Sequence, residues 1–552
     1  MRVGTLEALG PLIVQICKIA GTPGMSLGVL HDGEIHQAHF GFRDIASGLP
    51  PDETTTYVIG SLTKAVTAAM VGILVEDGKL DWTTQLHSIL PEYTRDDKDP
   101  AINITIEDIL SHRTGLPGYD SLWLGSNNNP VLKRSDAVPI LGYLPVAKPL
   151  RTEFIYNNMA YEVAGQVIEK VSGIKYTDFL REHIVEPLAM LDTVYTEAPI
   201  DPKTASKAYS TLRDGSAHEI PRPLVGEDIL MGAAGGIRSS ITDLLILYEN
   251  MMHAGNIEFD GGDELPGNPF KQLRKLWKGM ISIPCESIRE CSYAMGWVRT
   301  ELPTMMGCTG PEGMPGICPP MIGKGLPSRL ALIHQGSVQG SVAFVALFPE
   351  STTAIVVMAN SVGLTDAVRL VGQLLIETTF ENGIEGAEYL EYAKKTAENG
   401  ATYLEEVQRE LKEGKSIDKP PNPLKAYVGR YYNAIGNYWI EVVVKDDALK
   451  LSFMGSEEEE SFDLEPYQGD AFFWITSHDQ EAKKARSTTF GKDHYILKFG
   501  CKRRSLMIGT VDMGCVSWKH DSAVDGEGET FRKTKGRSGS RIYRPVELGQ
   551  DL

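Results

Sequence analysis

Residues 58–70 read VIGSLTKAVTAAM, and this stretch places Ser61 three residues before Lys64. Small and aliphatic residues then recur at helical spacing as far as Gly78, so the pattern predicts a helix that begins at Ser61. Residues three apart on a helix share one face, here near the positive end of the helix dipole. A serine hydroxyl is a weak nucleophile until a neighbouring base takes its proton, and a lysine removed from water is such a base. The spacing therefore suits a reactive serine.

The same spacing also occurs elsewhere in the chain. Ser172/Lys175 lies where a predicted helix stops, and Ser416/Lys419 lies in a charged segment. An ordinary serine at the start of a helix would explain Ser61 equally well, so one motif is weak evidence. The neighbouring motifs have to decide between these readings.

Two further short motifs accompany the serine. Tyr156 and Asn158 form Y-x-N at the start of a predicted helix, in FIYNNMAYEVAG, and His334 and Gly336 form H-x-G at the end of the predicted strand RLALIHQG. Each motif taken alone is equally compatible with a structural role. Their spacings also recur at Tyr248/Asn250, Tyr431/Asn433, His31/Gly33, His39/Gly41 and His253/Gly255.

Composition and charge restrict the class of protein. The 552 residues suit two or three domains, and 42% hydrophobic with 23% charged residues is typical of a globular protein with a large core. The net charge of −19 argues against nucleic acid and anionic membrane surfaces as partners. No run of apolar residues is long enough for a membrane span.

The cysteines and the first residues bear on location. Seven scattered cysteines follow neither a disulfide framework nor a metal-ligand spacing, so we expect reduced thiols. The apolar stretch LEALGPLIVQICKIAG contains Glu7 and leads directly into a strand pattern, so we expect a first helix rather than a targeting segment. Together these features favour a cytoplasmic protein.

The order of the predicted elements indicates the architecture. Strand patterns lie near residues 25–42 and again in AMGWVRT, RLALIHQG, SVAFVALFP and TAIVVMAN, with helical patterns between them. We therefore expect an α+β fold (an α/β sandwich), in which an antiparallel sheet is flanked by helices and a helical cluster lies beside it. This domain would span 1–385. A charged helical connector would follow at 386–424, and short alternating strands predict an all-β barrel at 425–552.

The three motifs occur in the order S-x-x-K, Y-x-N, H-x-G, and this set resembles the motifs of the serine β-lactamase and penicillin-binding protein superfamily. The chain is most similar to the class C β-lactamase, D-aminopeptidase, esterase and transesterase branch, where Y-x-N replaces S-D-N and H-x-G often replaces K-T-G. Further matching segments are ILSHRTGLPGY, AAGGIRSSITDL, YAMGW and HQGSVQGSVAFVALFPE. Some members also carry a lipocalin-like barrel after the catalytic domain.

The resemblance implies a catalytic group of three residues. Ser61 would be the nucleophile that becomes acylated, and Lys64 would hold or receive its proton. Tyr156 would act as general base, either as tyrosinate or as part of a hydrogen-bonded pair with Lys64. The sequence leaves open which of the two is the base.

The resemblance also implies four residues that bind substrate. Asn158 would orient the substrate and Lys64, and His334 would occupy the place of the family's lysine on the strand edge. Gly336 would let the backbone approach the substrate closely. The backbone amides of Ser61 and Ser337 would form an oxyanion hole. Neither a metal nor an organic cofactor is expected.

The implied function is a serine hydrolase or acyltransferase acting on an ester, thioester or amide of a small molecule, for example in secondary metabolism. Without the lysine of K-T-G, penicillins are not expected as natural substrates. The alternatives are a D-amino-acid peptidase or amidase and a catalytically idle binding scaffold. The candidate partners are the acyl substrate, an acyl-carrier donor and a second copy of the chain.

Residues 301–328 form an unusual insertion between two predicted strands. A tight hairpin needs only a few residues, whereas this segment is long and rich in Gly, Pro and Met. Its apolar residues are Met305, Met306, Met314, Ile317 and Met321. We expect this loop to cover the acyl or acceptor pocket, although a solvated hairpin extension would explain it as well.

Overall fold

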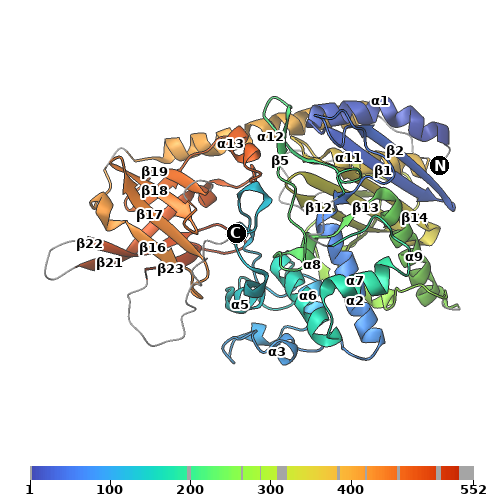
Figure 1. Cartoon of the computed structure of the whole chain (residues 1–552), viewed down its shortest axis with the longest axis horizontal. Helices are drawn as coiled ribbons and strands as arrows, with labels where there is room; N and C mark the ends of the chain where they lie inside the picture. The colour runs from blue at the N-terminus through green and yellow to red at the C-terminus, as the bar shows by residue number, and fades with distance from the viewer. Residues whose placement is uncertain are drawn as a thin grey trace.

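The computed structural model describes residues 3–195, 201–262, 265–285, 287–306, 320–381, 386–416, 419–456, 460–504 and 511–533. The chain folds into a larger body, which contains the first helix, and a smaller β-barrel beside it (Figure 1). The long helix α12 (Gly386–Gly414) runs along both bodies and connects them.

The larger body is built on one eight-stranded antiparallel sheet with the order β2-β1-β14-β13-β12-β9-β8-β7. Segments far apart in sequence meet in it, since β1 pairs with β14 along six residue positions, from Met25 opposite Ala359 to Leu30 opposite Ala354. The strands are β1 (Gly24–His31), β2 (Glu34–Gly41), β7 (Ile281–Ser282), β8 (Cys291–Tyr293), β9 (Val298–Leu302), β12 (Arg329–Val338), β13 (Ser341–Phe348) and β14 (Thr353–Ala359).

Helices cover both faces of this sheet because its central strands are apolar on both sides. All eight residues of β13 are buried, and they alternate between two cores. Phe344 and Ala346 face the core formed with α1 (Val3–Ala20) and α11 (Ala367–Thr379). Val345 and Leu347 face the core that contains α2 (Thr63–Glu76) and α9 (Ile241–Asp260). A strand buried on both faces reads as a continuous apolar run.

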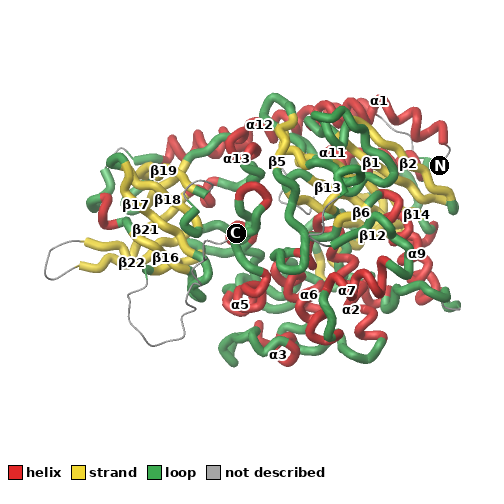
Figure 2. The backbone as a smooth tube through the Cα atoms, viewed as in Figure 1, coloured by secondary structure: helices red, strands yellow, loops and turns green. Residues whose placement is uncertain are grey.

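A cluster of mostly short helices lies below the sheet and extends the core that contains α2 and α9 (Figures 1 and 2). The expected α+β architecture, with a flanked antiparallel sheet and a helical cluster, is confirmed. The remaining elements of this body are α3 (Leu86–Ile89), α4 (Ile106–Leu110), α5 (Ala137–Tyr143), α6 (Asn158–Ser172), α7 (Tyr176–Leu180), α8 (Gly232–Gly235), α10 (Leu273–Leu276), β3 (Tyr57–Val58), β4 (Ala208–Thr211), β5 (Ala217–Ile220), β6 (Arg238–Ser239), β10 (Thr304–Met305), β11 (Met321–Ile322) and β15 (Ser361–Val362).

The C-terminal body is a closed barrel in which each strand pairs with its sequence neighbours and β16 also pairs with β23. The predicted all-β barrel is therefore confirmed. Its strands are β16 (Gly429–Tyr432), β17 (Trp439–Lys445), β18 (Ala448–Phe453), β19 (Ser461–Pro466), β20 (Ala471–Trp474), β21 (Ile496–Arg504), β22 (Val511–Trp518) and β23 (Glu529–Arg532), and α13 (His478–Lys483) follows β20. The domain limits at 385, 424 and 552 stay predictions, and residues 382–385 and 534–552 lie outside the described residues.

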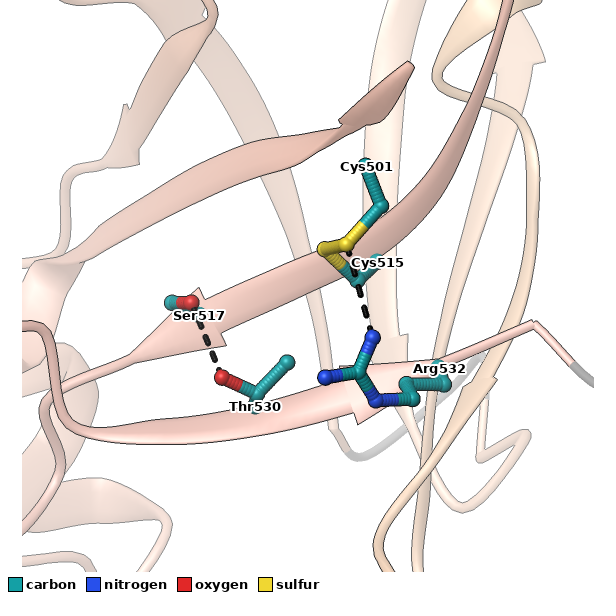
Figure 3. Close-up of a disulfide and its surroundings, with 5 residues drawn as sticks. All are labelled: Cys501, Cys515, Ser517, Thr530 and Arg532. Carbon is teal, nitrogen blue, oxygen red and sulfur yellow. Dashed lines mark hydrogen bonds between the residues drawn. A yellow bond between two sulfur atoms is a disulfide. The ribbon is translucent and has the colours of Figure 1, made fainter. Parts of the chain in front are cut away.

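The expectation of reduced thiols is wrong for one pair of cysteines. Cys501 and Cys515 form a disulfide between β21 and β22, with their Cα atoms 5.4 Å apart (Figure 3). The register places Cys515 opposite Gly500, next to Cys501. Two cysteines 14 residues apart carry no such signal in sequence, because only the pairing of the two strands brings them together.

Part of the 301–328 segment lies on the face of the sheet away from α2. β10 pairs with β11, and Met306 and Ile322 are buried in the core with α11. Gln373 of α11 donates a hydrogen bond to the Met306 carbonyl, at 3.1 Å. The described ends of the segment therefore lie on the α11 side of the sheet, and the covering loop stays a prediction. Met314 and Ile317, on which the expectation also rested, lie outside the described residues.

Over the described ranges, no helix combines the length and the apolar character that a membrane crossing requires.

Candidate active site

Ser61 and Lys64 meet at the start of α2. Ser61 lies in a short 3₁₀ turn, Gly60–Leu62, and α2 itself begins at Thr63, two residues later than expected. The Lys64 Nζ donates hydrogen bonds to Ser61 Oγ at 2.9 Å and to the Ala234 carbonyl at 2.8 Å. Lys64 is fully buried, so its amino group has exchanged water for these two oxygens.

Burial sets the protonation of Lys64. It lowers the pKa of the Lys64 amine to about 7, while the neighbouring Asp120 carboxylate acts in the opposite direction. At neutral pH a large fraction of Lys64 is then the free amine, which can accept a proton. The arrangement supplies a base within hydrogen-bonding distance of a serine hydroxyl.

Tyr156 contacts the same hydroxyl. Its phenol shares a hydrogen bond with the Ser61 side chain, and its ring centroid lies 4.9 Å from Lys64 Nζ. Burial raises the pKa of Tyr156 above its usual value, so the neutral phenol predominates. The ring also packs on His112 at a centroid distance of 4.2 Å. Of the two candidate bases, this environment favours the Lys64 amine over a tyrosinate.

Asn158 faces an acidic residue that sequence reasoning missed. Its Nδ2 donates to both carboxylate oxygens of Asp120, at 3.1 and 3.0 Å. Trp123 donates to the same carboxylate at 2.9 Å. Burial raises the pKa of the Asp120 carboxyl. The only sequence signal for Asp120 is its place directly after the LPGY of a family-like segment.

His334 is buried and uncharged. Its Nδ1 donates to the Gln335 carbonyl at 2.8 Å, so the neutral ring accepts through Nε2 from the Tyr293 hydroxyl at 3.0 Å. Burial and the neighbouring Lys64 lower the pKa of His334 to about 3. His334 therefore does not replace the positive charge of the family's lysine. Tyr293, its partner, was also missed by sequence reasoning.

Glycines let β12 lie directly against the turn that carries Ser61. A Cβ at Gly336 would lie 2.0 Å from the Ile59 carbonyl oxygen, and a Cβ at Gly60 would lie 2.8 Å from the Ser337 amide nitrogen. Gly60 also has a φ of +53°, which favours glycine. The close approach brings the amides of Ser61 and Ser337 to the same place. Their role as an oxyanion hole stays a prediction.

A cavity of about 310 Å³ opens in front of Ser61. Of the predicted site residues, Ser61, Asn158 and Ser337 line it, and Asp120 does so as well. The other predicted site residues, Lys64, Tyr156, His334 and Gly336, are not among its lining residues. The same cavity continues to side chains of the C-terminal barrel, among them Glu460 and Arg486.

The barrel also fixes the loop that carries Asp120. The Tyr119 amide donates to the Asp521 carboxylate at 2.8 Å, and the Ser121 hydroxyl donates to the His520 carbonyl at 3.0 Å. Further along this loop, Arg486 Nε donates to Ser126 Oγ at 2.7 Å. The two bodies therefore meet at the site. No grouping of His, Cys, Asp and Glu suited to a metal ion occurs in the part of the chain that the structure describes.

Comparison with known proteins gives the family. The family described as Beta-lactamase matches residues 12–378, so this chain belongs to the β-lactamase family. A second family, described as a domain of unknown function (DUF3471), matches residues 414–499, which include much of the barrel.

Two curated relatives are named unguisins hydrolases. That of Aspergillus violaceofuscus is 27% identical over 63% of this chain and 60% of its own length. That of Aspergillus campestris is 25% identical over 76% of this chain and 72% of its own length. The match thus covers less than two thirds of the first of these relatives.

Solved structures agree on the fold. A penicillin-binding protein homologue from Pyrococcus abyssi, described as octameric, has a TM-score of 0.54 at 21% identity, covering 87% of this chain and 94% of its own. A class C β-lactamase has a TM-score of 0.53 at 18% identity, covering 69% of this chain and 98% of its own. At these identities the likeness concerns the fold alone.

Proposed function

We propose that this chain is a serine hydrolase that forms an acyl-enzyme at Ser61, with Lys64 as the base. The observation that carries the proposal is the 2.9 Å contact between Ser61 Oγ and the fully buried Lys64 Nζ. Because the pKa of Lys64 is lowered to about 7, this amine can take the serine proton at neutral pH. Membership of the β-lactamase family supports the same reaction class.

In the proposed reaction, each proton has a carrier. Ser61 Oγ bonds to the carbonyl carbon while its proton passes to Lys64 Nζ. The oxygen that becomes negative lies at the amides of Ser61 and Ser337. The Lys64 ammonium then returns the proton, through the Tyr156 phenol, to the departing alcohol, thiol or amine. Water attacks the acyl-enzyme and gives its proton to Lys64, which restores the Ser61 hydroxyl.

The substrate we propose is an uncharged ester, thioester or amide of a small molecule. His334 is neutral, and Arg486, a cation at the far side of the cavity, is paired with Glu460 at 3.3 Å and Glu481 at 3.2 Å. A substrate carboxylate would therefore meet acidic groups rather than an available cation. Two relatives named hydrolases favour water as acceptor over acyl transfer, and an amide-cleaving activity is included in this class.

Labelling with a short alkyl fluorophosphonate tests the proposal. The intact mass should increase by one adduct, and peptide mapping should place it on Ser61. Ser61→Ala should abolish the label, whereas Ser172→Ala, which removes the serine of an equally spaced S-x-x-K, should keep it. Hydrolysis of p-nitrophenyl acetate should follow the same pattern. An adduct that persists in Ser61→Ala, or no adduct in the wild-type protein, would refute the proposal.

A further inference from the structure

The cavity beside Ser61 continues into the C-terminal barrel, where aromatic side chains surround it. The same continuous cavity that Ser61 and Ser337 line at one end is lined by barrel residues at the other. Its aromatic lining from the barrel includes Tyr438, Phe453, Phe462, Trp474, Phe490 and Trp518. An eight-stranded barrel is just wide enough to hold one small ligand where side chains leave room.

The topology explains why this end of the barrel faces the site. Successive strands are antiparallel neighbours, so β18, β20 and β22 run in one direction and end at the same rim. Phe453, Trp474 and Trp518 are the last residues of these strands. The segments that follow β20 and β22 contact the 119–129 loop, through the Lys484 carbonyl and through 520–521. The aromatic rim therefore opens toward Asp120 and the nucleophile.

The aromatic rings form one connected wall. Phe453 stacks on Trp518 with centroids 4.9 Å apart, and Trp474 lies 5.7 Å from Phe462. Phe490 stacks on His494 at 3.9 Å. Such rings bury a large apolar area with few rotatable bonds, which suits a flat ligand.

The polar groups at this end define the rest of the ligand. Arg486 is compensated by Glu460 and Glu481, so the mouth carries no excess positive charge to attract an anion. The Tyr495 hydroxyl and His494 Nδ1 are buried and have no hydrogen-bond partner among the described residues. Both residues line the cavity. An unpartnered buried polar atom is costly, and a ligand with a hydrogen-bonding atom would remove that cost.

We propose that the barrel forms the second half of the substrate site, where it binds an uncharged aromatic group of the molecule that Ser61 attacks. The connection to the reaction rests on the proposed function, whereas the binding of an aromatic ligand by the barrel does not. Specificity would then come from the C-terminal domain and chemistry from the α2 region. A substrate without such a group would react but would lose the affinity that the barrel provides.

Binding of an uncharged two-ring fluorophore, N-phenyl-1-naphthylamine, tests the barrel half directly. Full-length wild-type protein should bind it saturably. Phe490→Ala and Phe462→Ala, which change half-buried rings and so spare the barrel core, should weaken binding about tenfold, since each ring removes apolar contact area. Tyr432→Ala, a half-buried barrel aromatic outside the cavity, is the matched control and should bind as wild type does. Equal affinities in all four proteins would overturn the proposal.

Two phosphonylating probes of Ser61 test whether the barrel and the Ser61 region bind the same molecule. One carries a methyl group and the other a naphthyl group on a short alkyl linker. The ratio of labelling rates, naphthyl over methyl, should fall about tenfold in Phe490→Ala and stay unchanged in Tyr432→Ala. Prior labelling with the naphthyl probe should block the fluorophore, while the methyl probe should not. An unchanged ratio in Phe490→Ala would refute the connection. Normal fluorophore binding without labelling by either probe would refute the proposed reaction and leave the barrel site standing.

Discussion

Ser61/Lys64 and Ser172/Lys175 share one spacing but lie in opposite environments. Lys64 is completely buried and bonds to Ser61 Oγ, whereas the Lys175 side chain is 57% exposed and pairs with Glu227 at 3.5 Å. Ser172 is the last residue of α6, and its hydroxyl accepts from the Ile174 amide of the following turn. The comparison teaches that burial of the lysine, rather than the spacing, distinguishes the pair that we propose as reactive.

The packing of α2 explains the difference. α2 lies in the core beside the sheet, and twelve of its residues are buried, so the Lys64 side chain is withdrawn from bulk water. Lys175 precedes the short helix α7 at the surface and keeps its ordinary hydration. A surface ion pair such as Lys175 with Glu227 contributes little to the stability of the fold.

The largest effect should follow removal of the nucleophile. Ser61→Ala should lower ester hydrolysis by about 10⁴-fold or more, because no other group can form the acyl-enzyme. Ser172→Ala should leave the rate unchanged within error. Steady-state rates on p-nitrophenyl acetate measure both. Comparable losses in the two variants would abolish the distinction between the two pairs.

Removal of the proposed base, Lys64, should have the second largest effect on the rate. Lys64→Met should lower the rate by about 10³-fold, within the range of a lost general base, while Lys175→Met should keep wild-type activity. The lowered pKa of Lys64 also predicts how the free energy of unfolding depends on pH. Lys64 lowers stability in full below about pH 7, and this loss shrinks as pH rises from 7 toward the unfolded pKa, because only the unfolded chain keeps the proton there. Lys64→Met should therefore melt a few degrees higher at pH 7.5. A variant that is both active and less stable would contradict the assignment.

Two of the Y-x-N motifs allow a similar comparison. Tyr156→Phe should reduce turnover by about 10²-fold because the phenol relays a proton. Tyr431, whose hydroxyl donates to the Tyr427 carbonyl at 2.7 Å, is the matched control. Tyr431→Phe should cost about 1 kcal/mol of stability and no activity. Thermal melts and rates for both variants separate the relay from a structural role.

The sequence predicted the sheet well and the site in part. SVAFVALFP and TAIVVMAN became β13 and β14 because continuous apolar runs fit a strand buried on both faces. The three motifs were found because each is local, and the fold brings Ser61, Lys64 and Tyr156 together. Asp120 was missed because its meaning depends on Asn158, which approaches it only in the folded chain.

Features that depend on contacts between distant segments could not be predicted from the sequence. The disulfide depends on the register of β21 and β22, and the barrel's part in the cavity depends on how its rim meets the 119–129 loop. The lid predicted at 301–328 stays a prediction, because residues 307–319 lie outside the described residues. At its described ends, Met306 and Ile322 pack in the core beside α11, whereas Met321 is exposed.

A smaller effect should follow from a change at Asp120. The Asp120 carboxylate raises the pKa of Lys64 against the effect of burial, and it holds Asn158. Asp120→Asn should therefore move the acid limb of kcat/KM to lower pH and reduce turnover about tenfold through misplacement of Asn158. The pH profile is the informative measurement, since a purely structural defect would lower the rate without moving the limb.

The most direct measurement of the central claim is the pH dependence of Ser61 labelling by a short fluorophosphonate. Only the free amine of Lys64 can accept the serine proton, and the pKa of Lys64 is lowered to about 7. The labelling rate should therefore rise as pH increases through about 7 and then level off, and this inflection should disappear in Lys64→Met while remaining in Lys175→Met. An inflection near the ordinary lysine pKa, or the same inflection near 7 in Lys64→Met, would contradict the account.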